Sequence, residues 1–297
     1  MIQDIYPHAY HNEYHDLQPQ ENDFILIFHK NKALVRYNGE KLRYPTFNEL
    51  KGFECAYHYL FSIDEYKYFL AYPSEQLLKN TDQGTPSILL SGYRYEDVRI
   101  FRSAPSKHNA FAGITAHHLF SWYQSNQFCG CCGQRMVPDH NERMLYCPSC
   151  HNMVYPKISP AVIVGVLNGN KILMSKYAGR PYTNYALIAG FTEIGECAEQ
   201  TVAREVMEEV GFKVKNIRYY KSQPWPHSSS LLFGFFAQLD GDDETIQLEE
   251  EELSMAVWMH RDDLPMEADH VSLTNEMILY FKENPLAFET MPHQNIL

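Results

Sequence analysis

The sequence predicts a mixed fold of α+β and α/β type in three consecutive parts, and three observations carry this prediction. Residues 1–125 contain several short apolar runs rich in Tyr and Phe, which is typical of an α+β domain. Residues 126–154 contain two Cys-x2-Cys pairs, which indicate a small metal-binding ribbon. Residues 155–297 contain strand-like runs around a helical segment, which favours an α/β/α sandwich.

The first part begins with a predicted β-hairpin. The segment from Phe24 to Tyr37 holds two apolar runs around the polar turn HKNK. The segment from Phe111 to Asn126 is interpreted as a helix that leads into the ribbon. Its adjacent residues His117 and His118, within the segment, are expected to have packed or exposed side chains rather than to be metal ligands. We assign no catalytic residue to this part.

The second part carries a predicted zinc site. Cys129, Cys132, Cys147 and Cys150 supply four thiolates at the spacing of a zinc ribbon, which holds Zn²⁺ in a tetrahedron. Cys131 lies inside the first pair and is an alternative ligand, although Cys132 keeps the two-residue spacing. Because the positive and negative charges of the ribbon balance, we expect the zinc to be structural.

The third part alternates predicted strands with two helices. Its first strands form a hairpin from Ala161 to Tyr177, joined around Asn168-Gly169, a strong short turn signal. The later predicted elements are strands at 216–223 and 231–239, an acidic stretch at 240–252, a strand at 256–260 and a helix at 273–282. This order supports the sandwich.

The most specific pattern of the chain lies between these strands, from Gly190 to Phe212. It fits the template G-x5-E-x7-R-E-U-x-E-E-x-G-U, in which U is apolar. Every fixed position is filled, by Gly190, Glu196, Arg204, Glu205, Val206, Glu208, Glu209, Gly211 and Phe212. Seven fixed identities arise by chance in such a chain on the order of once in a million.

This pattern, called the box below, predicts a helix from Glu196 to Val210 that ends at Gly211 in the left-handed conformation. On this helix Glu205, Glu208 and Glu209 share one face, because they are spaced at i, i+3 and i+4. Their carboxylates suit Mg²⁺ or Mn²⁺, which activate water and polarise phosphoryl oxygens. A solvated acidic face is the alternative interpretation.

Two other features of the box are expected to shape the site. Arg204 is predicted to pair with a box glutamate and so fix its side chain, with a direct phosphate contact as the alternative. Gly190 and Gly195 are expected to let the loop fold closely over the metals, since glycine tolerates positive φ. We therefore place Glu196 and Arg204 with the three helix glutamates among the catalytic residues.

The box identifies the chain as a member of the Nudix hydrolases, and its surroundings narrow the resemblance. A four-cysteine ribbon precedes it, Tyr155-Pro156-Lys157 follows the ribbon, and SQPWPHSSS (Ser222 to Ser230) follows the box. These features resemble the NADH pyrophosphatases, whose motif is SQPWPFPxS. The resemblance implies hydrolysis of NADH or NAD⁺ to nicotinamide mononucleotide and AMP, and it extends to NAD-capped RNA.

The resemblance also implies ligands and substrate contacts. It places Mg²⁺ or Mn²⁺ on Glu205, Glu209, Glu252 and the carbonyl of Ala189, with Glu251 as the alternative to Glu252. It places substrate contacts at Glu142, Tyr155, Phe191, Gln223, Pro224, Trp225, Pro226, His227, Ser228, Ser229, Ser230 and Thr274. It further implies a homodimer, in which the aromatic side chain of Phe191 acts across the interface.

The chain departs from the family at His227-Ser228, where the motif has Phe-Pro. This departure leaves open a Nudix hydrolase for ADP-ribose or FAD. A non-catalytic Nudix regulator that senses a nucleotide is a further alternative, although such a protein is expected to have lost box glutamates.

The bulk composition limits the partners. A net charge of −12 disfavours DNA binding, because the DNA backbone requires a basic surface. No run approaches the roughly 18 apolar residues that span a bilayer, so no membrane partner is expected. Since no secretory signal is visible and the cysteines suggest metal rather than disulfides, we expect a cytoplasmic protein.

Overall fold

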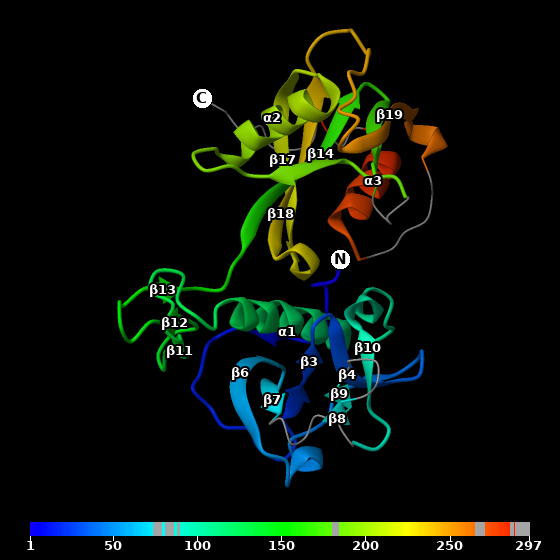
Figure 1. Cartoon of the computed structure of the whole chain (residues 1–297). Coiled ribbons are helices and arrows are strands. Elements are labelled where there is room, and N and C mark those ends of the chain that lie inside the picture. The colour runs from blue at the N-terminus through cyan, green and yellow to red at the C-terminus, as the bar shows by residue number, and fades with distance from the viewer. Residues whose placement is uncertain are drawn as a thin grey trace. The chain divides into compact units, whose positions relative to one another are not determined.

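The computed structural model of the chain describes residues 1–73, 79–80, 86–87, 90–179, 184–264, 271–285 and 288. Residues 74–78, 81–85, 88–89, 180–183, 265–270, 286–287 and 289–297 lie outside the described residues. The chain divides into two compact units, one formed by residues 2–157 and the other by Met1 with residues 158–297 (Figure 1). The four-cysteine ribbon therefore shares a unit with the N-terminal segment.

The described part of the first unit contains two four-stranded sheets, the two-stranded sheet β8–β9, the sheet of the ribbon and one long helix. The first sheet has the strand order β1-β6-β7-β2, and the second has the order β10-β4-β3 with β5 paired to β4. The strands are β1 (Tyr10–His11), β2 (Phe24–Leu26), β3 (Phe28–His29), β4 (Lys32–Tyr37), β5 (Leu42–Arg43), β6 (Cys55–Ile63), β7 (Tyr66–Pro73), β8 (Lys79–Asn80), β9 (Pro86–Ser87) and β10 (Arg94–Asp97). Figure 1 shows the helix α1 (Lys107–Ser125) beside these strands.

Two predictions for this unit are confirmed. The hairpin within Phe24–Tyr37 is present, with Phe28 opposite Ala33 and His29 opposite Lys32. The predicted helix is α1, which begins four residues earlier than expected, at Lys107 after Ser106.

The histidine pair of α1 is packed, as predicted. The Nε2 atom of His117 lies 3.1 Å from the carbonyl oxygen of Lys30, and that of His118 lies 2.9 Å from the carbonyl oxygen of Lys157. Burial lowers the pKa of both imidazoles. These histidines therefore tie α1 to backbone segments far away in the sequence.

The ribbon forms a three-stranded sheet in the order β11 (Val137–Pro138), β12 (Leu145–Tyr146), β13 (Met153–Val154). Side chains join it to the N-terminal segment of the same unit. The hydroxyl of Tyr14 donates to the carbonyl of Asp139 over 2.9 Å, and Arg143 donates to the side chain of Asn12 over 2.7 Å.

The second unit is built on one six-stranded sheet with the order β17-β18-β14-β15-β19, in which β16 also pairs with β14. Its strands are β14 (Ser159–Asn168), β15 (Lys171–Tyr177), β16 (Ile188–Phe191), β17 (Val214–Trp225), β18 (Ser230–Leu239) and β19 (Leu253–His260). The pair β14–β18 is parallel, and the other pairs are antiparallel.

The two helices α2 (Ala198–Val210) and α3 (Leu273–Glu283) cover opposite faces of this sheet (Figure 1). Alternation along β14 explains the two layers, because successive side chains of a strand point to opposite faces. Val162 packs in one core cluster with Val206 of α2, whereas Ile163 packs in another with Met277 of α3. The predicted α/β/α sandwich is confirmed.

Two boundaries in this unit differ from the predictions. The hairpin turn is Gly169-Asn170, one residue later than expected, because Asn168 still pairs with Lys171. Helix α2 begins at Ala198 instead of Glu196, since Cys197 precedes the helix in an extended conformation. Its start is stabilised by the side chain of Gln200, which accepts from the amide of Cys197 over 2.9 Å.

The end of α2 is as predicted. Gly211 adopts the left-handed conformation with φ 77°, and its amide donates to the carbonyl of Met207 over 3.0 Å. Within the described residues no helix is both long and apolar enough to cross a lipid bilayer.

Candidate active site

Six glutamates enclose one small cavity beside α2. The cavity has a volume of about 410 Å³, and its lining consists of Glu205, Glu208, Glu209, Glu249, Glu251 and Glu252. Glu205 and Glu209 are buried, with 8% and 2% exposure, whereas Glu208 faces solvent. The three box glutamates on the helix, Glu205, Glu208 and Glu209, therefore line one site, as their spacing predicts.

Backbone hydrogen bonds bring the acidic stretch to this helix. The amide of Glu249 donates to the carbonyl of Glu209 over 3.0 Å, and the amide of Gln247 donates to that of Val210 over 3.1 Å. These carbonyls belong to the last turn of α2, where no helical partner is available to them. Capping the helix thus places the following glutamates at the cavity.

This arrangement bears on the distal metal ligand. Glu251 and Glu252 both line the cavity, so both of the predicted alternatives lie at the site. Glu249 lines it as well, and we did not single it out from the sequence. Only its position at the start of a run of four glutamates pointed to it.

Arg204 binds both the loop before α2 and the helix itself. Its Nε and Nη2 atoms donate to the two carboxylate oxygens of Glu196, over 2.6 and 3.0 Å. Its Nη1 atom donates to Glu205 over 2.7 Å and to Glu208 over 2.9 Å. Nη2 also donates to the carbonyl of Phe191 over 2.9 Å. The predicted pairing of Arg204 with a box glutamate is confirmed, and three glutamates take part.

The charges of these groups shape their titration. The guanidinium of Arg204 holds the pKa of Glu196 down to about 2, and the amide of Glu193 contributes to this. Burial raises the pKa of Glu205, and Glu208 and Glu252 add to the rise, although Arg204 opposes it. A cluster of carboxylates with one arginine carries excess negative charge, which divalent cations neutralise.

Gly190 leaves the space that Glu205 occupies. A Cβ atom at Gly190 would lie 1.9 Å from the carboxyl carbon of Glu205. Positive φ is found at Gly195, with 99°, and not at Gly190. Our reason for Gly190 was therefore wrong, because the position requires glycine for its lack of a side chain. Its neighbour Ala189 lies opposite Ile163 in the sheet.

The predicted substrate motif forms the end of a long hairpin between β17 and β18. Residues Pro226–Ser228 make one 3₁₀ turn, and Ser229 follows with φ 53°. The rings of Trp225 and His227 lie 5.1 Å apart between centroids. Pro226 and Ser230 are buried, whereas Pro224, His227 and Ser228 are exposed. The exposed members of the motif are thus concentrated at the hairpin tip.

Gln223 lies deeper and is fully buried. Its Nε2 atom donates to the carbonyl of Val271 over 2.8 Å, and its Oε1 atom accepts from the amide of Leu273 over 2.7 Å. The side chain therefore holds the first turn of α3. The predicted contact of Gln223 with substrate stays a prediction.

The remaining predicted contacts lie in several places. Phe191 is 52% exposed at the end of β16, and Thr274 is half-buried in the first turn of α3. Glu142 and Tyr155 belong to the other unit, where the hydroxyl of Tyr155 donates to Glu142 over 2.9 Å. Two residues that were named separately thus form one hydrogen-bonded pair.

The ribbon brings its four predicted thiols together. The Sγ atoms of Cys129, Cys132, Cys147 and Cys150 all lie within 4.8 Å of one another. Sulfurs in a zinc tetrahedron are about 3.8 Å apart, since each Zn–S bond is about 2.3 Å. The cluster contains Cys132 and not Cys131, as the two-residue spacing predicts. The donor set and its compactness fit zinc.

Comparisons with known proteins agree with this architecture. The family model described as NUDIX domain matches residues 157–281, and the one described as NADH pyrophosphatase zinc ribbon domain matches residues 124–155. A Salmonella paratyphi C protein named NAD-capped RNA hydrolase NudC is 38% identical over 186 residues, which cover 62% of this chain and 72% of that protein. The chain belongs to the Nudix hydrolases with a zinc ribbon of the NADH pyrophosphatase type.

Other relatives of this Nudix hydrolase are similar over shorter spans. An Enterobacter protein with the same name is 45% identical over 148 residues, which cover 50% of this chain and 57% of that one. A solved Nudix hydrolase from Nitrosomonas europaea is 26% identical and has a TM-score of 0.47. It aligns with 56% of this chain and 95% of its own.

Proposed function

We propose that this Nudix hydrolase cleaves the pyrophosphate bond of NADH or NAD⁺ with Mg²⁺ or Mn²⁺. Water adds to one phosphorus and the bridging P–O bond breaks, which releases AMP together with nicotinamide mononucleotide from NAD⁺ or reduced nicotinamide mononucleotide from NADH. The observation that carries the proposal is the cavity lined by six glutamates, three of them on the box helix. The zinc-ribbon family model and the relatives named NAD-capped RNA hydrolase support the choice of substrate.

The donor set of the cavity fits hard divalent cations. Glu205, Glu209, Glu252 and the carbonyl of Ala189 would hold them, with Glu251 as the alternative to Glu252. Bound Mg²⁺ or Mn²⁺ supplies Lewis-acid polarisation of the phosphoryl oxygens and activation of the attacking water. Glu208 lines the same cavity and is exposed enough to orient that water.

Arg204 and Glu196 act through the glutamates they position. Because Arg204 is held by both carboxylate oxygens of Glu196, its Nη1 atom is directed to Glu205 and Glu208. The pair thereby limits the orientations available to Glu205. Such preorganisation lowers the cost of assembling the site when substrate binds.

The exposed aromatic groups would contact the dinucleotide. Trp225 and His227 offer adjacent rings at the hairpin tip, and Phe191 offers an exposed ring beside the box loop. Ser228, Ser229 and the backbone around Pro224 and Pro226 complete the proposed wall with Ser230. Thr274, Glu142 and Tyr155 are further proposed contacts. Phe191 and the fully exposed Ile194 also support a homodimer, since both expose large apolar side chains within one short segment.

We extend the proposal to NAD-capped RNA, because its cap contains the same pyrophosphate bond. The relatives' names support this extension. We also propose a cytoplasmic location, since four clustered thiols retain zinc in a reducing compartment. We likewise propose three domains: an N-terminal α+β domain at residues 1–125, the zinc ribbon at 126–154 and the Nudix domain at 155–297.

One observation favours a second substrate class. The exposed His227 and Ser228 replace the Phe-Pro of the family motif, which changes the ring and the rigidity of the hairpin tip. Hydrolysis of ADP-ribose or FAD is therefore the alternative. A regulator without catalysis is disfavoured, because every fixed glutamate of the box is retained and three of them, Glu205, Glu208 and Glu209, line the cavity.

A substrate panel tests the proposal. NADH, NAD⁺, ADP-ribose, FAD and NAD-capped RNA are incubated with the full chain and Mg²⁺ or Mn²⁺, and the products are identified by mass spectrometry. We expect AMP with nicotinamide mononucleotide from NAD⁺, or AMP with reduced nicotinamide mononucleotide from NADH, at the highest kcat/KM. Faster turnover of ADP-ribose or FAD would establish the alternative, and no turnover of any compound would refute an enzymatic role.

A further inference from the structure

A second cavity lies within the unit formed by residues 2–157, and none of the residues assigned above lines it. Its volume is about 630 Å³, inside the range of roughly 300–1,000 Å³ that is usual for small-molecule sites. Three chain segments and the last turns of α1 build it: the β3–β4 turn, the end of β7 and the strand β10. The glutamate cavity belongs to the other unit.

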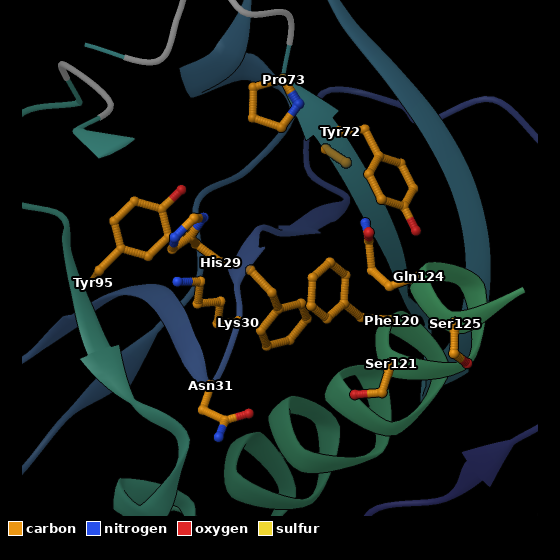
Figure 2. Close-up of a pocket in the computed structure, with 12 residues that line it drawn as sticks. His29, Lys30, Asn31, Tyr72, Pro73, Tyr95, Phe120, Ser121, Gln124 and Ser125 are labelled. Carbon is orange, nitrogen blue, oxygen red and sulfur yellow. The ribbon is translucent and has the colours of Figure 1, made fainter. Parts of the chain in front are cut away.

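Aromatic rings form most of its apolar surface. The rings of Phe28 and Phe120 lie 5.3 Å apart between centroids, and each residue is only 8% exposed. Tyr72 packs against Phe120 at 6.4 Å, and Tyr95 packs against His29 at the same distance. Figure 2 shows Tyr95 and His29 on one side of the cavity and Tyr72 on the other.

These rings are held in place before any ligand binds. Tyr72 is flanked by the ring of His58 at 5.6 Å, and Phe28 by that of His117 at 5.3 Å. The carbonyl of Lys30 is bound by His117, which joins the β3–β4 turn to α1. A flat ligand would therefore meet preformed walls, and preformed walls reduce the entropy lost on binding.

The charge of the lining selects the ligand further. Lys30 lines the cavity, and it makes no ion pair with another described residue. Among the described residues no carboxylate contributes to the lining, although the chain carries a net charge of −12. Burial, with Lys30 and Lys32, lowers the pKa of His29. The polar groups of Asn31, Ser121, Gln124 and Ser125 complete the rim.

The combination excludes two simple ligand classes. A cation would meet Lys30 and no carboxylate among the described lining residues, and a purely apolar molecule would make no use of the exposed ammonium of Lys30 or of the polar rim. A planar heteroaromatic ring that carries an anionic group satisfies both features. The ring stacks on aromatic faces, and the anion binds the lysine.

We propose that this cavity is a nucleotide-binding site separate from the active site, with the base between Tyr95, Phe120 and Tyr72 and the phosphate on Lys30. A free nucleoside monophosphate and a nucleotide within single-stranded RNA present the same chemistry. The site does not depend on the proposed hydrolysis, because all of its residues lie in the other unit.

The test uses the full chain without added divalent metal and two probes, AMP and pentaadenylate RNA. Affinities are measured by isothermal titration calorimetry. The site is located by photo-crosslinking of 8-azido-AMP followed by peptide mapping. Mapping is required because AMP is also a product of the proposed reaction. We expect labelled peptides that contain Tyr72 or Tyr95.

Two variants and one control examine the lining. Lys30→Asn removes the charge at an exposed position whose φ of 51° asparagine tolerates, and Tyr95→Leu removes a ring. Lys41→Asn removes an exposed charge of the same unit outside the cavity. We expect Tyr95→Leu to weaken binding at least about fivefold, as loss of one stacked base does, and Lys30→Asn to weaken it while Lys41→Asn does not.

The two probes distinguish the sources of the nucleotide. Equal affinity for AMP and RNA identifies a free nucleotide as the ligand, and tenfold tighter binding of RNA identifies a strand. Labelling confined to residues 158–297, or equal effects of Lys30→Asn and Lys41→Asn, would overturn the proposal. Thermal melting confirms that each variant is folded, and Lys30→Asn alone decides the result if Tyr95→Leu is unstable.

Discussion

Gly190 lies so close to Glu205 that a single methyl group would come within 1.9 Å of the carboxyl carbon. The strand β16 and the helix α2 therefore define the position of this carboxylate from two sides: Gly190 by its missing side chain and Arg204 by its hydrogen bond of 2.7 Å. The catalytic geometry depends on a residue without functional groups.

Replacement of Gly190 by alanine tests this dependence. The added methyl group has to displace Glu205, and a displacement of about 1 Å in a catalytic group costs roughly 10²-fold in rate. We expect kcat/KM for the best substrate to fall by about this factor while the protein remains folded. Gly130→Ala is the control, because its added Cβ meets no atom within 4 Å. Full activity of Gly190→Ala would contradict the assignment of Glu205.

Glu209→Gln removes a buried charge with little change in shape. We expect loss of metal-dependent turnover by at least about 10²-fold, because a neutral amide binds divalent cations poorly. Mn²⁺ binding followed by electron paramagnetic resonance checks the cause independently of activity. Glu199→Gln lies on the same helix outside the cavity and is expected to retain both properties.

The Glu196–Arg204 pair predicts a pH-dependent stability. The pKa of Glu196 is about 2 in the folded protein against an ordinary 4.5, so the charged form is favoured by folding. Its contribution is complete above pH 4.5 and is lost as the pH falls toward 2. Urea unfolding without divalent metal should show a stability gap between wild type and Glu196→Gln that narrows from pH 6 to pH 3. The variant Glu196→Gln/Arg204→Met should show no such narrowing relative to Arg204→Met.

The four clustered thiols predict one bound zinc per chain that supports folding. Cys147→Ser removes a buried ligand, and we expect loss of zinc in elemental analysis together with a lower melting temperature. Cys131→Ser provides a close control, since Cys131 lies outside the cluster. This variant should retain the zinc. Equal zinc content of the two variants would show that the cluster holds no ion.

His227→Phe examines the departure from the family motif. The substitution keeps a ring beside Trp225, which lies 5.1 Å away, but removes its polar nitrogens. We expect a lower KM for NADH at nearly constant kcat if the tip contacts the nicotinamide or the adenine. The double change to Phe-Pro at 227 and 228 should extend the effect. An unchanged kcat/KM in both variants would show that the tip is neutral for NADH.

Local patterns predicted the parts of the fold that local physics determines. The apolar run that begins at Ala161 placed Val162 and Ile163 in a strand of a sandwich, and their side chains pack in core clusters with α2 and α3. The spacing of the box glutamates placed them on one helix face. The pairing of Arg204 with a box glutamate was predictable because the nearest charged residues in the sequence are glutamates. These predictions required only neighbours in the sequence.

Long-range contacts explain what the sequence did not show. Glu249 reaches the cavity because its amide caps the carbonyl of Glu209, 40 residues earlier. Gln223 binds residues 48 and 50 positions later, and no local pattern announces such a pair. The aromatic cavity of the first unit likewise combines four segments whose spacing carries no motif.

The burial of Gln223 separates a residue with a structural role from the other residues of the SQPWP segment and its continuation. Since both ends of the Gln223 amide bind the first turn of α3, a substitution there acts on the helix even if substrate never touches it. Trp225, His227 and Ser228 lie at the hairpin tip, at or directly before the 3₁₀ turn Pro226–Ser228. A mutant library that seeks new dinucleotide specificity can randomise these three positions and leave Gln223 constant, so that the support which Gln223 gives to α3 is preserved.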